Sequence, residues 1–300
     1  MNAHRSILLG ILAATVVLTS AHATTGVVDN NSASATTESS EALISKSYDF
    51  LESGDSELAL DGFNAVLKED ATNLSARLGQ AMIFSDQLRH EDAFSSYDLI
   101  IKAYPNNAFA WNGRGLAAFN LEDFDEALSS FKKATSDQPM NGFFYESLAW
   151  VQLCRGDYSE AALAAKRAAL LYNHNGETPS YPLLISYFAN LSSGDKSEAA
   201  IALKYARNNK PANNQWPTPV FDYLAGIINA PDLISYVRDT AQETEAHTYI
   251  GLQLRSQDKA EVAKMHLDWV AQNGDERVFE HMLARTLVRK QADKVALLVQ

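Results

Sequence analysis

The sequence contains one glycine pattern with the spacing of a phosphate-binding turn. Gly113, Gly115 and Ala118 match the G-x-G-x-x-A spacing with which a turn after a β-strand holds the pyrophosphate of a dinucleotide. That chemistry needs a strand before the first glycine, and here both glycines fall inside a predicted helix. At these positions small residues let two helices approach closely. We therefore interpret them as packing residues and predict no cofactor.

The histidines and acidic residues also lack the spacing of a reactive site. No two of the seven histidines are four residues apart, the spacing that places two imidazoles on one helix face for a metal. His247 and His266 fall on facing helices of one predicted repeat and could approach each other, but we expect packing or surface roles. The sequence has no G-x-S-x-G elbow, P-loop or Cys–His nucleophile. We therefore predict a protein that is not an enzyme and has no metal site.

Composition excludes further classes of function. Thirty-seven acidic residues against 25 basic ones give a net charge of −12. Because no basic stretch could follow a phosphate backbone, we exclude nucleic acid as a partner. Cys154 is the only cysteine, so no disulfide can form within the chain. Stability must then come from packing, and we expect Cys154 itself to be buried or half-buried.

The N-terminus has the pattern of a secretory signal peptide. Arg5 precedes the apolar run Ile7–Leu18, and Ala21 and Ala23 supply the small residues that a signal peptidase recognises. The run is shorter than the ~20 residues of a membrane-spanning helix. We predict a signal peptide over 1–23 and a flexible linker rich in Ser, Thr and Asn over 24–40. We expect no membrane-spanning segment after removal of the signal, and export to the periplasm rather than to the medium.

A fixed period of 34 residues organises the rest of the chain. Its clearest markers are Ala59, Ala93, Ala127 and Ala161. Five residues before these alanines stand Gly54, Leu88, Glu122 and Gly156. A period of this length predicts a solenoid, in which each unit buries its apolar face only by stacking on its neighbours.

Each unit is predicted to fold as two amphipathic helices, over 108–121 and 124–136 in the third unit. The period slips by four residues after Asn173 and is then interrupted by a segment rich in Pro and Asn. The sequence therefore predicts an all-α solenoid of about six units, with an irregular helical insertion and a C-terminal capping helix. Its parts are a five-unit array over 41–207, an insertion over 208–243 with helices at 220–229 and 232–240, and a sixth unit with the capping helix over 244–291.

The third unit resembles the tetratricopeptide repeat. Arg114 replaces the family's usual leucine, but the other offsets agree. The family's pattern of Trp, Gly, Ala, Phe, Ala and Pro is matched by Trp111, Gly115, Ala127, Phe131, Ala134 and Pro139. The resemblance implies stacked helical hairpins that form a scaffold for binding other proteins.

The interrupted layout is similar to that of the NlpI-type periplasmic adaptors of bacteria. Thr244–Gly251 and the Phe279-Glu280-His281 stretch look like that family's C-terminal repeat and closing helix. NlpI-type proteins are lipid-anchored, whereas this chain has no cysteine near its predicted cleavage site. The resemblance implies an adaptor for envelope proteins, in a family whose repeats hold a processing protease and its cell-wall hydrolase substrates.

On the geometry of the tetratricopeptide family, the first helices of stacked units line a concave groove. Aromatic side chains there would anchor an extended or helical segment of a partner protein. Some of these side chains could instead pack between units in the core. The predicted groove residues are Met82, Asp86, Phe109, Asn112, Phe119, Asn120, Phe143, Glu146, Trp150, Tyr181, Leu184 and Phe188.

Two functions remain open from the sequence. The favoured one is a non-catalytic adaptor that binds envelope proteins. The alternative is a protein associated with the cell wall or with polysaccharide, whose aromatic and Asn side chains would stack on and hydrogen-bond sugars. The segment Val278–Leu287 also offers a surface for a homodimer.

Overall fold

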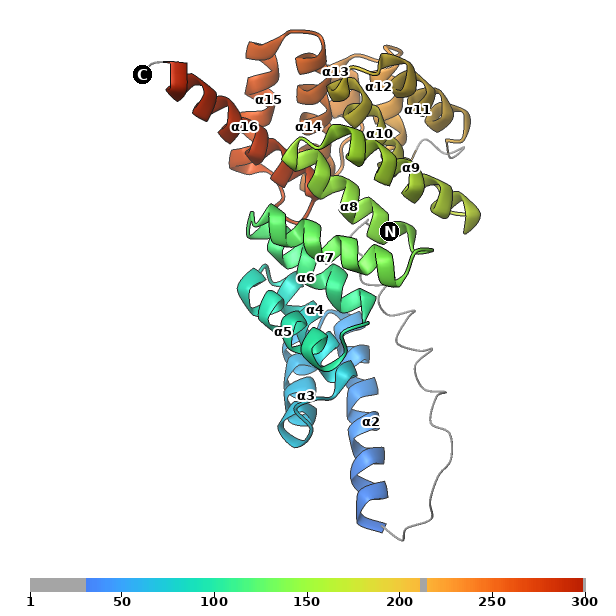
Figure 1. Cartoon of the computed structure of the whole chain (residues 1–300), viewed down its shortest axis with the longest axis vertical. Coiled ribbons are helices and arrows are strands. Elements are labelled where there is room, and N and C mark those ends of the chain that lie inside the picture. Colours follow the sequence, from blue (N-terminus) through green and yellow to red (C-terminus); the bar gives the residue numbers. More distant parts are fainter. Residues whose placement is uncertain (1–30, 211–214, 299–300) are drawn as a thin grey trace. The chain divides into compact units, whose positions relative to one another are not determined.

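The structure, a computed structural model, describes residues 31–210 and 215–298 (Figure 1). Fifteen α-helices and no β-strand occur in this part of the chain, which confirms the predicted all-α class. The predicted signal peptide over 1–23 lies outside the described residues. None of the helices described is long and apolar enough to cross a membrane.

The helices fall into two compact units, which meet in sequence between Asp137 and Gln138. Unit 1 contains α2 (Asn31–Ser53), α3 (Ser56–Glu69), α4 (Leu74–Asp86), α5 (His90–Ala103), α6 (Ala108–Asn120) and α7 (Phe124–Asp137). Unit 2 contains α8 (Gly142–Arg155), α9 (Tyr158–His174), α10 (Ser180–Ser193), α11 (Lys196–Asn208), α12 (Thr218–Leu224), α13 (Ala230–Ser235), α14 (Thr240–Ser256), α15 (Ala260–Asn273) and α16 (Phe279–Leu298).

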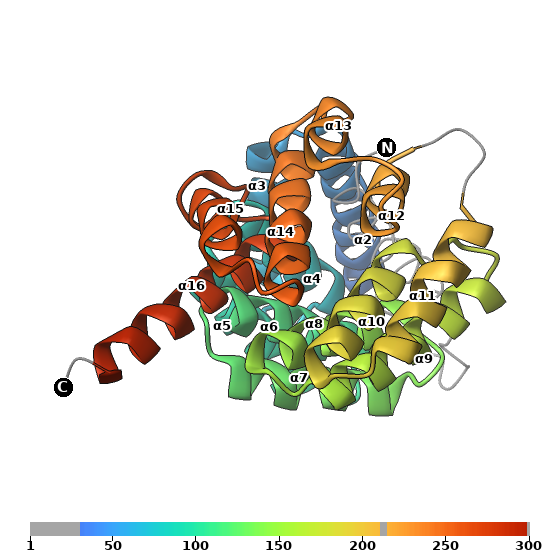
Figure 2. The same ribbon diagram turned by 90° about the horizontal axis from the view of Figure 1, so that it is seen from above.

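Consecutive helices pair into hairpins within each unit. Unit 1 pairs α2 with α3, α4 with α5 and α6 with α7, and unit 2 pairs α8 with α9, α10 with α11 and α14 with α15. These hairpins coincide with the repeats expected from the period. In Figure 2, α14 stands between α15 and the short helices α12 and α13, which form the insertion. The last helix, α16, packs on α8, α14 and α15.

The 34-residue period recurs in the residues that begin the first helices. Asn73, Asn107 and Asn141 precede α4, α6 and α8, and each side-chain oxygen accepts a backbone N–H from the first turn. Such a cap satisfies one of the donors that a helix start leaves without an intrahelical partner.

The turn between the two helices of every hairpin has one residue with a positive φ. Glycine adopts this conformation freely, whereas other residues pay about 1–2 kcal/mol. Three of the six positions therefore carry a local cost that packing of the hairpin must offset. The six residues, with φ between 58° and 93°, are Gly54, Leu88, Glu122, Gly156, Gly194 and Asp258.

Small residues set the distance between the helices of a hairpin or of neighbouring repeats. Ala127 of α7 has no exposed surface. A Cβ atom on Gly113 would lie 2.3 Å from Cζ of Tyr97, so α6 approaches α5 only because this position has no side chain. Both glycines of the G-x-G-x-x-A stretch lie inside α6. The interpretation as packing glycines agrees with this placement.

Several helix boundaries differ from the sequence expectation. The helices predicted over 220–229 and 232–240 are observed as the shorter α12 (Thr218–Leu224) and α13 (Ala230–Ser235). The predicted linker reaches residue 40, but α2 begins at Asn31. Leu43 and Tyr48 of α2 pack against the core of unit 1, and a helix once formed extends without the cost of a new nucleus. In unit 2, α14 begins at Thr240, where Asp239 caps it, and α16 continues to Leu298.

The insertion is part of the core of unit 2. Val220 of α12 and Leu233 of α13 have no exposed surface, and they pack in one apolar cluster with Leu184 of α10 and Ile250 of α14. Cys154 of α8 is also buried, as expected. The interruption of the period therefore adds helices that join the fifth and sixth hairpins.

We expect Ala127→Glu to destabilise unit 1 by about 3 kcal/mol, because it puts a charge into the closed contact between α6 and α7. Denaturant unfolding measures the change. Ala65→Glu is the matched control, since Ala65 of α3 is exposed, and its stability should stay within about 0.5 kcal/mol of wild type. Equal stabilities of the two variants would contradict the assigned register.

Candidate binding surface

The first helices of unit 1 contact one another from repeat to repeat. α2 packs on α4, and α4 packs on α6, while each also pairs with the second helix of its own hairpin. They therefore form the inner layer of this unit, as the groove prediction assumes. Six of the predicted groove residues lie on α4 and α6.

The structure separates these six residues by exposure. Met82 and Phe119 are buried in the core, with 3% and 1% of their surface exposed. Asp86 is exposed, and Phe109 and Asn120 are half-buried. Solvent therefore reaches the C-terminal ends of α4 and α6 and the start of α6. Met82 and Phe119 instead pack in the core, which was the alternative that the sequence left open.

Asn112 is the unusual residue of this layer. It is 2% exposed, and its side-chain oxygen Oδ1 has no hydrogen-bond partner within the described residues. Buried polar atoms are rarely left unpaired, because the loss of hydration costs about 1–3 kcal/mol. A bound chain could place a backbone N–H on this acceptor only if the Asn112 side chain turned out of the core.

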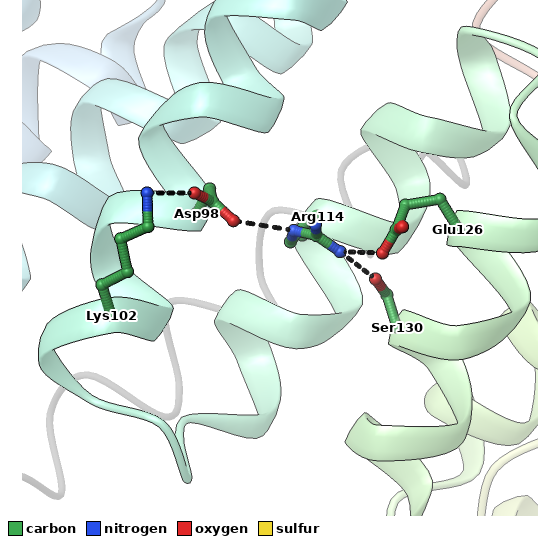
Figure 3. A network of polar contacts seen from close by, with 5 residues as sticks. All are labelled: Asp98, Lys102, Arg114, Glu126 and Ser130. Carbon is green, nitrogen blue, oxygen red and sulfur yellow. Dashed lines mark hydrogen bonds and ion pairs between the residues drawn. The ribbon is translucent and has the colours of Figure 1, made fainter.

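A network centred on Arg114 fixes α6 between its neighbours (Figure 3). Its Nε lies 3.2 Å from Oδ1 of Asp98 on α5. On α7, its Nη1 pairs with Glu126 and donates to Oγ of Ser130 at 2.9 Å. The guanidinium carbon also lies 4.4 Å from the ring centre of Phe94. The residue that departs from the repeat pattern thus joins three helices of unit 1.

The charge of Asp98 is stabilised from two sides. Lys102 lies 2.8 Å from its Oδ2, and Arg114 approaches its Oδ1. The hydrogen bond from Lys102, with smaller contributions from the charges of Lys102 and Arg114, lowers the pKa of this carboxyl below its usual range. Asp98 therefore stays ionised, and the network is intact, at any pH near neutrality.

In unit 2, several predicted groove residues are covered by other helices of the same unit. The ring of Trp150 on α8 stacks on Phe279 of α16, with ring centres 5.4 Å apart and planes 2° apart. Phe188 on α10 stacks in the same way on Tyr249 of α14, at 5.7 Å. Leu184 has no exposed surface. These three predicted groove residues contact helices of their own chain, so an external ligand could reach them only after α14 and α16 moved away.

Carboxyl groups are buried at the same contact. Glu245 of α14, which is 4% exposed, accepts hydrogen bonds from Nε1 of Trp216 at 2.6 Å and from the hydroxyl of Tyr181 at 3.2 Å. Glu280 of α16, which is 3% exposed, accepts one from the hydroxyl of Tyr249. Tyr181, another predicted groove residue, is thereby engaged within unit 2.

The buried carboxyls hold their protons to unusually high pH. Burial and then the charge of Glu280 raise the pKa of Glu245 well above the ordinary value. Burial likewise raises the pKa of Glu280 to about 7 and that of the predicted groove residue Glu146 to about 7. Phe143, the remaining predicted groove residue, is half-buried at the start of α8. We assign Glu245 and Glu280 a structural role, because both lie in the interior of unit 2, whereas Glu146 is half-buried.

Sequence reasoning missed Glu245, Glu280 and Trp216 as members of this cluster. Glu245 and Glu280 stand in the two stretches that carry the NlpI-type resemblance, and this was the signal available. Their proximity to Glu146 could not be read from spacing, because it depends on how the insertion returns α14 to α10. Among the described residues, no group of three or more His, Cys, Asp or Glu side chains is arranged to hold a metal.

Comparisons with known proteins agree with this architecture. The tetratricopeptide repeat family model matches residues 45–108 and 112–182. No curated protein matches the sequence. Among solved structures, a tetratricopeptide repeat protein from Parabacteroides merdae is 17% identical with a TM-score of 0.58, over 83% of this chain and 99% of that one.

Two further solved structures are similar over a shorter stretch. MamA is 19% identical, with a TM-score of 0.51, over 57% of this chain and 91% of that chain. YrrB, described as a tetratricopeptide repeat protein with an unusual peptide-binding site, is 13% identical, with a TM-score of 0.50, over 62% of this chain and 91% of that chain. At these identities the likeness establishes the fold and nothing about ligands.

We expect Arg114→Ala to destabilise unit 1 by about 2 kcal/mol, because it leaves Asp98 and Glu126 without their shared partner. Arg114→Leu should lose less, since leucine can keep an apolar contact with Phe94. Denaturant unfolding of the two variants measures the difference. Equal losses would show that the aromatic contact contributes nothing.

We expect part of the stability of unit 2 to depend on pH. The pKa of Glu280 is raised to about 7 in the folded protein, against about 4.3 in an unfolded chain. Its stabilising contribution is therefore complete below about pH 4.3 and is lost as the pH rises through 7. Glu280→Gln keeps an acceptor for Tyr249 but cannot ionise. Its melting temperature, relative to wild type, should rise by about 3 °C or more between pH 5 and pH 8.

The control for this comparison is Glu160→Gln, because Glu160 of α9 is exposed. Its melting temperature should follow that of wild type across the same pH range. A difference between wild type and Glu280→Gln that does not change with pH would show that Glu280 is ionised throughout.

Proposed function

Because residues 45–108 and 112–182 match the tetratricopeptide repeat model, and the general role of such repeats is to bind other proteins, we propose that this protein is a non-catalytic adaptor of the bacterial periplasm. Its ligand is a segment of an envelope protein, and the site is the inner layer of unit 1. A processing protease or a cell-wall hydrolase is the partner that the NlpI-type layout favours. Export rests on the signal-peptide pattern of residues 1–23.

The observation that carries this proposal is the unpaired oxygen of Asn112. A peptide backbone laid along α4 and α6 would donate an N–H to Oδ1 once the Asn112 side chain turned toward it, and would thereby remove the cost of leaving a buried acceptor unsatisfied. The exposed Asp86 and the net charge of −12 favour a partner segment that also carries a basic residue. Half-buried Phe109 and Asn120 supply apolar and polar contacts at the two ends of α6.

Unit 2 contributes less surface to this function. Trp150, Tyr181 and Phe188 are engaged with α14, α16 and their carboxyl groups, so we restrict the proposed site to unit 1. Of the carboxyls with raised pKa values, which would suit acid–base chemistry, Glu245 and Glu280 lie in the interior of unit 2 and Glu146 is half-buried there.

Site-specific photocrosslinking in living cells tests the proposal. A crosslinking residue at Asp86 or Asn120 should give discrete adducts with an envelope protein. The same residue at Leu58 or Leu99 should not, because these are exposed positions on the second helices α3 and α5. Adducts of equal yield from all four positions would place binding elsewhere.

Asn112→Ala should weaken binding of the crosslinked partner about tenfold, since the lost hydrogen bond is worth about 1 kcal/mol or slightly more. Affinity is measured with the purified partner, and the melting temperature of the variant serves as the folding control. Unchanged affinity in a folded Asn112→Ala protein would contradict the assigned site. Retention on isolated peptidoglycan freed of other proteins would instead favour the polysaccharide alternative.

A further inference from the structure

Two histidines of the sixth hairpin face each other at close range. His247 lies on α14 and His266 on α15, and their Nδ1 atoms are 2.9 Å apart. Both residues are half-buried, so the pair lies at the edge of the core and not inside it. The two helices pair along their length, which holds the rings in place without any help from a ligand.

The aromatic ring of Trp269 supports one side of the pair. It stacks on His247 with ring centres 4.3 Å apart and planes 23° apart. Trp269 follows His266 by one helical turn, so both residues come from the same face of α15. The His247 ring is thus confined between Trp269 and His266.

Both imidazoles are uncharged near neutral pH. Burial, and then the charge of His266, lowers the pKa of His247 to about 4, and burial lowers the pKa of His266. In the neutral pair one Nδ1 donates its proton to the other. If that proton instead occupies Nε2 of the same ring, both Nδ1 lone pairs become available and no proton leaves the protein.

The spacing of the two nitrogens selects among metal ions. With metal–nitrogen bonds of about 2.0–2.1 Å, nitrogens 2.9 Å apart subtend an angle of about 90° at a shared metal. Neighbouring ligands in tetragonal Cu²⁺ and Ni²⁺ complexes meet at this angle, whereas tetrahedral Zn²⁺ needs a wider one. His266 is the less confined of the two, and a rotation of its ring about χ2, which is broad for histidine, would turn its lone pair so that both Nδ1 atoms face one ion.

We propose that His247 and His266 form a two-imidazole site for one divalent first-row transition-metal ion of tetragonal preference, Cu²⁺ or Ni²⁺. Water fills the remaining positions, because Asp268, the nearest carboxylate along α15, is paired with Lys264. The site is independent of the proposed peptide-binding surface, which lies in unit 1.

Titration of the untagged protein with Cu²⁺ or Ni²⁺ tests the site through tryptophan fluorescence. A paramagnetic ion bound at the pair would quench Trp269, which stacks on one of its ligands. We expect saturable quenching with one ion per chain and tighter binding of Cu²⁺ than of Ni²⁺ or Zn²⁺. Trp269→Phe should remove the quenched component, which separates this site from ions bound elsewhere on the chain.

Two variants each remove one ligand. His247→Phe keeps an aromatic ring against Trp269, and His266→Gln keeps a polar side chain of similar length. Either should lower Cu²⁺ affinity about 100-fold, since a chelate that loses one arm also loses its avidity. His174→Gln, at an exposed histidine, should bind as wild type does. The electron paramagnetic resonance spectrum of the bound Cu²⁺ should show coupling to two imidazole nitrogens.

Unchanged quenching in folded His247→Phe and His266→Gln proteins would overturn the proposal. So would an absence of quenching in the wild type at millimolar Cu²⁺, which would leave the pair as a hydrogen bond between two histidines. Because the variants change different helices, the failure of one to fold leaves the other as a complete test.

Discussion

The structure depends on one constraint, which is that a hairpin of two short helices cannot bury its apolar face alone. Each helix of a repeat has only 13 or 14 residues in most of unit 1, and isolated helices of this length are marginal in water. Close approach at residues without bulk, such as Gly113 and Ala127, lets each hairpin rest on the next. The two units differ in what covers the apolar faces that this stacking leaves over.

The inner helices of the two units differ in what covers them. In unit 1 the inner helices leave Asp86 and Asn120 accessible and an acceptor on Asn112 unpaired, which suits a face that a partner chain finishes. In unit 2 the inner helices α8 and α10 are covered by α16 and α14, through the stacks of Trp150 on Phe279 and of Phe188 on Tyr249. In the segment Val278–Leu287, which the sequence offered as a homodimer surface, Met282, Leu283 and Ala284 are buried within unit 2.

The sequence predicted the local features because they repeat. The alanines at Ala59 and Ala127 fixed the register, and the positions of Gly54 and Glu122 marked the turns that do have positive φ. It could not predict which groove residues stay exposed, because Phe109 and Phe143 share a repeat position with Ser75, and Trp150 shares one with Leu116 and Met82, and position alone does not say what packs over each side chain. Contacts such as Tyr181 with Glu245, 64 residues away, leave no periodic trace. The facing positions of His247 and His266 were foreseen, but their 2.9 Å separation was not.

Covering the inner helices of unit 2 with α14 and α16 has an electrostatic cost, because it buries carboxyl groups. Apolar side chains alone would close the contact between α10, α14 and α16 at no electrostatic cost, whereas Glu245 and Glu280 must be buried with little compensating positive charge. Raised pKa values reduce that cost, because the carboxyls can keep their protons, and Trp216, Tyr181 and Tyr249 provide donors with a required direction. A hydrogen bond from the insertion to α14 is satisfied in only one arrangement of these helices. The carboxyl groups therefore fix the orientation of these helices, while apolar packing contributes most of the free energy of folding.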